Sequence, residues 1–188
     1  MAQGIGDNGA ARGNRWSLAI WGGATLLLAL PAVAMRFTTE VDWGPEDFIT
    51  MGILLAAACG GYEVATRISG NTAYRAAVAV AIVTAFVTVW VNLAVGMIGN
   101  EDNPANLLFG GVLLVALLGA VLAWFRPRGM AVAMATAALA QGTIAVYALF
   151  AGHGALALFI GLFVLPWLLS AQLFRVAARS LSQPRNRA

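Results

Sequence analysis

Six long apolar stretches, separated by short polar connections, constrain this chain more than any other feature of its sequence. Each stretch is long enough for an α-helix to cross about 30 Å of hydrocarbon at about 1.5 Å per residue. Strands are excluded because the stretches lack alternation, and an isolated segment in lipid must satisfy its own backbone hydrogen bonds. The sequence therefore predicts an all-α polytopic transmembrane bundle of six helices, at about 17–35, 47–66, 74–98, 105–125, 129–150 and 155–174.

Composition excludes a water-soluble fold. Hydrophobic residues make up 61% of the chain and charged residues only 10%, which is too few to cover a soluble domain of this size. We expect a flexible cytoplasmic tail over 1–15, a six-helix transmembrane domain over 16–175 and a basic cytoplasmic tail over 176–188.

Signals for helix starts and stops support these bounds. Pro45 and Pro104 each stand where a helix should begin, the first followed by carboxylates and the second preceded by Asn103 as the expected N-cap. The segment 69–72 predicts a turn and cap before the third helix, and 126–129 predicts the break between the fourth and fifth.

The placement of arginine predicts the orientation in the membrane. All eleven basic residues are Arg, and Arg36 is the only one expected on the outer side. The others fall on the opposite side, which the positive-inside rule assigns to the cytoplasm. Both termini are therefore expected in the cytoplasm, which requires an even number of spans, and these arginines should meet anionic lipid headgroups.

The first apolar stretch has a second interpretation. Ala32, Val33 and Ala34 resemble a cleavage site, so residues 1–34 could be a signal peptide, which would leave five spans. The stretch is longer than the usual apolar region of such a peptide, about 7–15 residues. We therefore favour an uncleaved helix.

Polar residues four apart form one face of the third helix, toward its outer end. Together with Gln141 on the fifth helix, they allow two hypotheses. Asn92 and Gln141 could hydrogen-bond across the two helices as a structural lock. Alternatively, the face could line a polar crevice that admits a small solute or a quinone-like headgroup. The lock is the favoured hypothesis, and the residues of the candidate crevice are Thr84, Thr88, Asn92, Asn100 and Gln141.

Charged residues form two further candidate groups. Glu63 precedes Arg67 by one helical turn, the spacing of an intrahelical ion pair, and we favour that structural role over a proton-carrying one. Outer carboxylates could bind a hard divalent cation if two loops meet, although solvated loop charge is the simpler interpretation. This outer acidic cluster comprises Glu40, Asp42, Glu46, Asp47, Glu101 and Asp102.

Residues for catalysis or cofactor binding are sparse. Cys59 is the single cysteine, His153 is the single histidine, and lysine does not occur. Disulfides, thiolate clusters, bis-histidine haem and a Schiff-base lysine are excluded within one chain. We predict no catalytic residue, metal or cofactor, and because the arginines form no dense run, no nucleic-acid partner.

Three segments carry a resemblance: 90–107, Tyr74–Ala77 and Phe125–Met130. On these the chain resembles a group of small bacterial multi-spanning inner-membrane proteins that are themselves uncharacterised, over about residues 35–174. The resemblance implies a bacterial inner-membrane location and no activity.

The function expected from these features is non-enzymatic. We interpret the chain as an accessory or structural component of a membrane assembly, packing against itself or a larger complex. The alternative is a small transporter or channel for a small solute or ion, working as a homo-oligomer. A membrane enzyme is the least favoured class.

Overall fold

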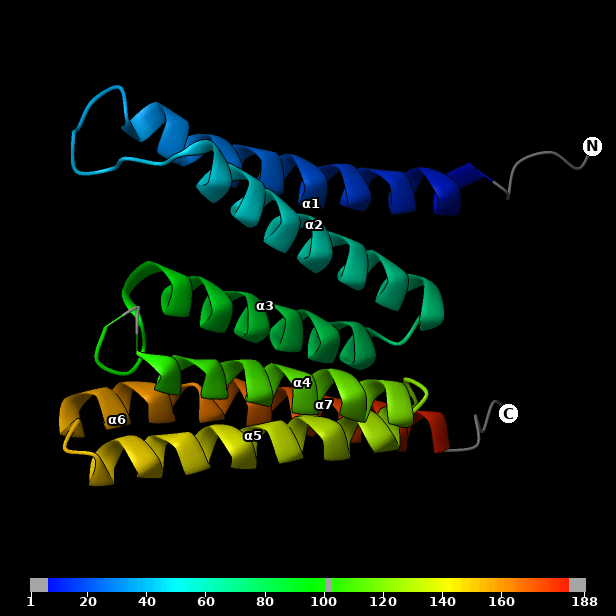
Figure 1. The fold of residues 1–188 in the computed structure, drawn as a ribbon. Coiled ribbons are helices and arrows are strands. Elements are labelled where there is room, and N and C mark those ends of the chain that lie inside the picture. Colours follow the sequence, from blue (N-terminus) through cyan, green and yellow to red (C-terminus); the bar gives the residue numbers. More distant parts are fainter. Residues whose placement is uncertain (1–6, 101–102, 183–188) are drawn as a thin grey trace, which may run out of the picture. The chain divides into compact units, whose positions relative to one another are not determined.

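The computed structural model describes residues 7–100 and 103–182, with side chains from Ser17 onward. The regular secondary structure within these ranges consists of helices, without a strand. The helices are α1 (Asp7–Ala34), α2 (Pro45–Ile68), α3 (Thr72–Val95), the short 3₁₀ turn η1 (Pro104–Asn106), α4 (Leu107–Leu122), α5 (Pro127–Phe150), α6 (Gly154–Leu162) and α7 (Val164–Ser182), as Figure 1 shows.

Six helical segments are long and apolar enough to cross a membrane, with α6 and α7 together forming the sixth. The predicted fold class and number of spans are confirmed. The chain is a multi-pass membrane protein whose outer surface contacts lipid.

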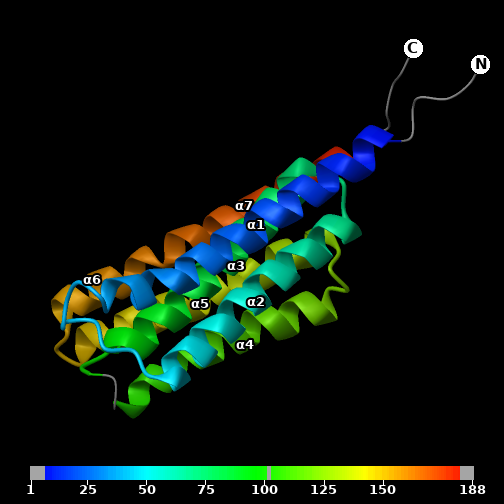
Figure 2. The same cartoon turned by 90° about the horizontal axis from the view of Figure 1, so that it is seen from above.

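The chain divides into two compact units, one ending at Val64 and the other beginning at Ala65. The first unit contains α1 and most of α2. None of the residues of the α1 span, Ser17–Ala34, is buried. In the second unit, α5 packs against α4, α6 and α7, and α3 packs against α7. Figure 2 shows α6 and α7 following one another in the same direction.

The helices α4 and α5 approach one another closely at two glycines. A Cβ atom added to Gly119 would lie 2.6 Å from Cβ of Ala133, and one added to Gly129 would lie 2.6 Å from Cβ of Ala123. Gly119 and Ala123 are four residues apart on one side of the contact, and Gly129 and Ala133 are four apart on the other. This glycine–alanine contact is the small-residue packing by which helices associate closely in lipid.

Two helices, α3 and α4, end three residues before their predicted bounds. α3 stops at Val95 because Gly96 adopts φ 68°, a conformation that glycine reaches readily. α4 stops at Leu122, and the following Trp124 and Phe125 have φ of 50° and 56°. A positive φ is unfavourable for such bulky residues, so the surrounding structure must hold this turn.

The two predicted tails differ from the structure where it describes them. α1 begins at Asp7, so residues 7–15 of the flexible tail expected over 1–15 are helical. A helix already formed by the apolar span extends easily, since each added residue contributes a backbone hydrogen bond. Likewise α7 continues to Ser182, into the predicted C-terminal tail. Residues 1–6 and 183–188 lie outside the described residues.

The sixth span, predicted as one continuous helix, is broken at Phe163, between α6 and α7. The cause is Pro166, which has no N–H to donate to the carbonyl of Leu162 and whose ring crowds that carbonyl. The N–H of Phe163 bonds instead to Ile160 O at 3.2 Å, the tighter spacing of a 3₁₀ turn.

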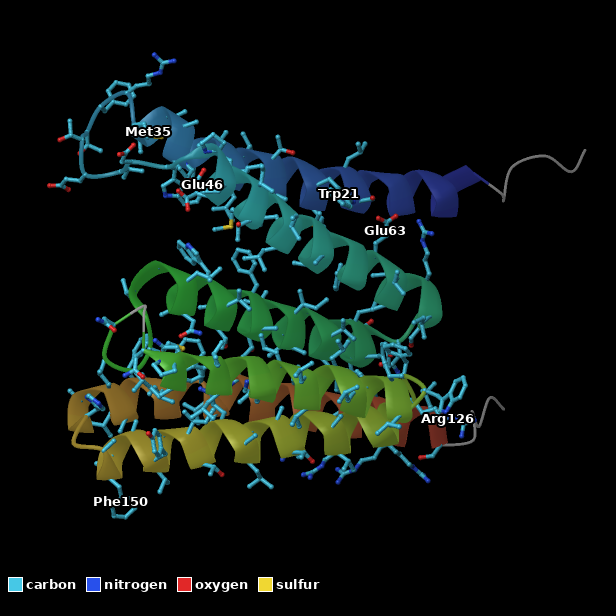
Figure 3. The ribbon with its side chains drawn as sticks, viewed as in Figure 1. Trp21, Met35, Glu46, Glu63, Arg126 and Phe150 are labelled. Atoms are coloured by element: carbon cyan, nitrogen blue, oxygen red, sulfur yellow. The ribbon has the colours of Figure 1, made fainter. Side chains whose placement is uncertain are left out.

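Contacts at one end of the second unit join the start of α3 to the ends of α4 and α7. Asn71 caps α3 by accepting from the N–H of Tyr74 at 3.0 Å, as predicted, and donates to Ser180 Oγ at 2.7 Å. The Tyr74 hydroxyl donates to Phe125 O at 3.0 Å. This is the arginine-rich end: in Figure 3, Arg126 lies at one end of α5 and Phe150 at the other.

Candidate functional site

The loop between α3 and α4 is organised around the side chain of Asn106, which is buried. Its Oδ1 accepts from the N–H groups of Met97 at 3.1 Å and Ile98 at 2.8 Å, and its Nδ2 donates to Asn100 O at 2.6 Å. Asn103 caps η1 by accepting from Ala105 N at 2.9 Å, which confirms its predicted role. Asn106 thus replaces the hydrogen bonds that this loop backbone would otherwise make with water.

Asn92, the centre of the candidate crevice, is bound to this same loop. Its Nδ2 donates to Asn106 O at 3.0 Å, and its Oδ1 accepts from Met97 N at 3.3 Å. Gln141 bonds elsewhere, through Nε2 to Ile160 O at 3.3 Å. The predicted Asn92–Gln141 hydrogen bond is therefore not formed: Asn92 holds the end of α3 to the loop, and Gln141 holds α5 to α6.

The threonines of the candidate crevice are buried and bond to their own helix. Thr84 Oγ1 donates to Val80 O at 2.7 Å, and Thr88 Oγ1 donates to Thr84 O at 2.8 Å. Such bonds to the carbonyl four residues earlier satisfy a hydroxyl in lipid without a partner helix. Asn100, the outermost member, is exposed and engages Asn106 through its backbone carbonyl. The two threonines are thus bonded along α3, the two asparagines to the loop around Asn106, and Gln141 to α6.

The bond made by Gln141 lies at the break between α6 and α7. Gln141 is fully buried, and it supplies a second N–H donor to the Ile160 carbonyl at the last turn of α6, which also accepts from Phe163 N. Donors on a neighbouring helix of this kind support broken helices within membranes. This role of Gln141 was not predicted from the sequence, although Pro166 inside an apolar stretch was a signal for the break.

A second buried hydroxyl stabilises the contact between α3 and α7. Ser170 Oγ donates to Ala77 O at 2.9 Å, and Ser170 is fully buried. Nearby, the rings of Tyr74 and Phe174 meet edge to face at 5.2 Å. The contacts of Ser170 and of Phe174 were not predicted from the sequence, because in each case the partner lies on another helix.

In the first unit, Glu63 has a partner that sequence spacing did not suggest. Trp21 Nε1 on α1 donates to Glu63 Oε2 on α2 at 3.2 Å, and Figure 3 shows the two side chains pointing toward one another. The contact links the two helices of this unit, as does the weaker approach of Cys59 Sγ to Ile20 O at 4.0 Å. The ion pair with Arg67 stays a prediction.

The outer acidic cluster is described only in part, because Glu101 and Asp102 lie outside the described residues. Asp47 Oδ2 accepts from Gly44 N at 2.9 Å, and so caps the start of α2. Among the described residues, no three His, Cys, Asp or Glu side chains are placed to hold a metal ion. Cation binding by the whole cluster stays a hypothesis.

Arg75 has a structural role besides its contribution to topology. Its Nε donates to Ser69 O and its Nη2 donates to Thr66 O, both at 2.9 Å. These carbonyls belong to the C-terminal end of α2 and the turn that follows. A guanidinium there satisfies carbonyls that the helix itself leaves without a donor.

Comparison of the chain with protein-family models, with curated proteins and with solved structures found no match. The resemblance to small bacterial inner-membrane proteins therefore stays a prediction, and function is argued from the residues alone.

Proposed function

We propose that this chain is an accessory or structural protein of a bacterial inner membrane, which forms part of a membrane assembly. The observation that carries the proposal is the use of polar side chains in the spans. Thr84, Thr88, Asn92 and Ser170 all bond to backbone groups of the second unit. Polar side chains that bond to the backbone of neighbouring helices and loops are typical of a structural membrane protein. Catalysis and transport instead need polar side chains directed at a substrate.

The proposed orientation places both termini in the cytoplasm. The described arginines of the second unit lie toward the end where α3 starts and α7 finishes, and the loop containing His153 lies at the other end of α5. Short loops rich in arginine stay in the cytoplasm during insertion. Anionic headgroups are the proposed partners of the arginines at that end, each contributing about 1 kcal/mol.

Thiol labelling tests the orientation. Cys59, the single native cysteine, is replaced by Ala, and one new cysteine is introduced as either Ser182→Cys or His153→Cys. In intact spheroplasts, a membrane-impermeant maleimide should label the variant at 153 at once and the variant at 182 only after lysis. The reverse labelling pattern would refute the proposed orientation, while the helical fold described above would still hold.

Native mass spectrometry tests the accessory role. The protein is extracted with mild detergent from its own membranes, at its natural abundance. We expect a larger assembly of constant mass and stoichiometry. A bare monomer, or a homo-oligomer alone, would contradict the proposal.

A small transporter or channel, working as a homo-oligomer, is the second candidate. The broken sixth span favours it, since discontinuous helices form the solute sites of many transporters. The discriminating measurement is flux through reconstituted vesicles, with rubidium ions and glycerol as probes. Flux above protein-free vesicles would favour this candidate.

A further inference from the structure

Two buried polar atoms near the break in the sixth span have no hydrogen-bond partner. They are Gln141 Oε1 on α5, an acceptor, and Trp167 Nε1 on α7, a donor. Both residues are at most 1% exposed. A buried polar atom without a partner destabilises a fold, so such atoms are rare and usually mark an ordered water or ligand.

Gln141 lies directly opposite the junction of α6 and α7. Its Nε2 is 3.3 Å from Ile160 O, on the last turn of α6. A Cβ atom on the adjacent Gly142 would lie 3.8 Å from Cγ2 of Val164, the first residue of α7. The side-chain amide of Gln141 is thus at the level where α6 ends and α7 begins.

Trp167 approaches the same level from the other side of the break. It lies in the first turn of α7, which packs against α5. Side chains in a helix lean toward its N-terminus, so the indole ring leans back from its own Cα toward the junction. The indole donor thus leans toward the level of the Gln141 amide, on a helix that packs against α5.

The junction offers a third polar group. Leu162 cannot receive the helical bond from position 166, because Pro166 has no N–H. Its carbonyl is an acceptor at the end of α6. The group that would complete these three must accept one hydrogen bond and donate two.

We propose that the junction of α6 and α7 binds one water molecule, which accepts from Trp167 Nε1 and donates to Gln141 Oε1 and to the Leu162 carbonyl. Buried waters typically make about three hydrogen bonds to polar groups that otherwise lack partners. An ion does not fit, since no charged residue occurs between Arg128 and Arg175 on α5, α6 and α7 to compensate its burial. This site is independent of the proposed function.

The test is nuclear magnetic resonance of the full chain with ¹⁵N-labelled tryptophan in deuterated detergent. Six tryptophans give six indole N–H signals, and Trp167→Phe identifies the relevant one by its loss. We expect a rotating-frame cross-peak between water and the Trp167 indole proton, with the sign of dipolar contact rather than of chemical exchange. The cross-peak itself is measured on the unaltered protein, and Trp167→Phe serves only to assign the signal.

Variants of α5 connect the water to Gln141. In Gln141→Leu the cross-peak should disappear, or in Gln141→Met if leucine prevents folding. Thr143→Val is the matched control, since Thr143 is exposed on the same helix and bonds only to Leu139 O. It should leave the cross-peak unchanged. A Trp167 signal without water contact in the unaltered protein would overturn the proposal, as would a cross-peak that survives the loss of the Gln141 amide.

Discussion

Replacing Gly119 by Ala should destabilise the packing of α4 on α5. The new Cβ would lie 2.6 Å from Cβ and 3.2 Å from Cα of Ala133. Optimal contact between carbon atoms is about 3.5–4.0 Å, so the overlap is about 1 Å. Ala133 has no rotamer by which its methyl group could move away, so the helices themselves must separate.

The expected magnitude follows from two opposing terms. Overpacking of this kind typically costs about 1–3 kcal/mol. Alanine also raises the stability of a helix relative to glycine, by about 1 kcal/mol. The net change for Gly119→Ala alone is therefore a loss of about 0–2 kcal/mol, too variable to interpret without a control.

Gly111→Ala on the same helix is that control, because an added Cβ there would meet no atom within 4 Å. It gains the same helix propensity without the overlap. The free energy of unfolding of Gly119→Ala should therefore lie about 1–3 kcal/mol below that of Gly111→Ala. Exchanging the two residues, in Gly119→Ala combined with Ala133→Gly, should recover most of this difference, since one methyl group is removed where another is added.

The assay is reversible unfolding in mixed micelles on titration with dodecyl sulfate, followed by tryptophan fluorescence. Equal stabilities for the variants at 119 and 111 would refute the close contact of α4 and α5. A deficit at 119 that the exchange does not relieve would also contradict it, because the strain would then lie elsewhere than at Ala133.

Three further predictions concern single hydrogen bonds, each measured as a shift in thermal unfolding in detergent. The free energy of unfolding should fall by about 1 kcal/mol in Asn92→Leu, because the Asn106 carbonyl loses the side-chain donor of Asn92 while Met97 N–H keeps its bond to Asn106 Oδ1. Thr88→Val should change little, since Thr88 bonds within its own helix. The free energy of unfolding should fall further in Asn106→Leu than in Asn92→Leu, since two buried N–H groups lose an acceptor. Tyr74→Phe should lose about 1 kcal/mol by removing the bond to Phe125 O while the ring contact remains.

The spans could be predicted from the sequence because a backbone in lipid must satisfy its hydrogen bonds internally. A long apolar stretch must be helical there, and caps such as Asn71 and Asn103 mark where the chain leaves the apolar region. Both caps bond as expected. The bounds failed where a glycine or a strained turn ended a helix early, at Gly96 and at Trp124. Those endings depend on single-residue conformations that hydropathy does not record.

The candidate site was predicted less well, for a different reason. Spacing places Thr84, Thr88 and Asn92 on one face of α3, but it does not say which group each side chain bonds to. In the structure, the threonines bond backward along their own helix, and Asn92 bonds forward to the loop. Partners on other helices, such as that of Ser170, depend on helix packing, which a single sequence does not specify.

Proline shows the same limit. Pro31 lies inside α1, which continues to Ala34, whereas Pro166 separates α6 from α7. Both prolines lack the N–H that a helix residue donates, so the sequence alone does not distinguish them. The donor that supports the broken span, Gln141, lies on another helix. A proline therefore marks a possible break, and donors on a neighbouring helix can support the broken segment.

These contacts change which residues a transport role would require. The polar face of α3 was the candidate path for a solute, but its described side chains are bonded to backbone groups of the fold. Among the described residues, the buried side-chain polar atoms without a partner belong to Gln141 and Trp167. If reconstituted vesicles carry a flux, it should fall in Gln141→Leu and persist in Thr88→Val. A flux with the opposite sensitivity would restore the face of α3 as the path, and an absence of flux would leave the junction as a hydrated break within a packing element.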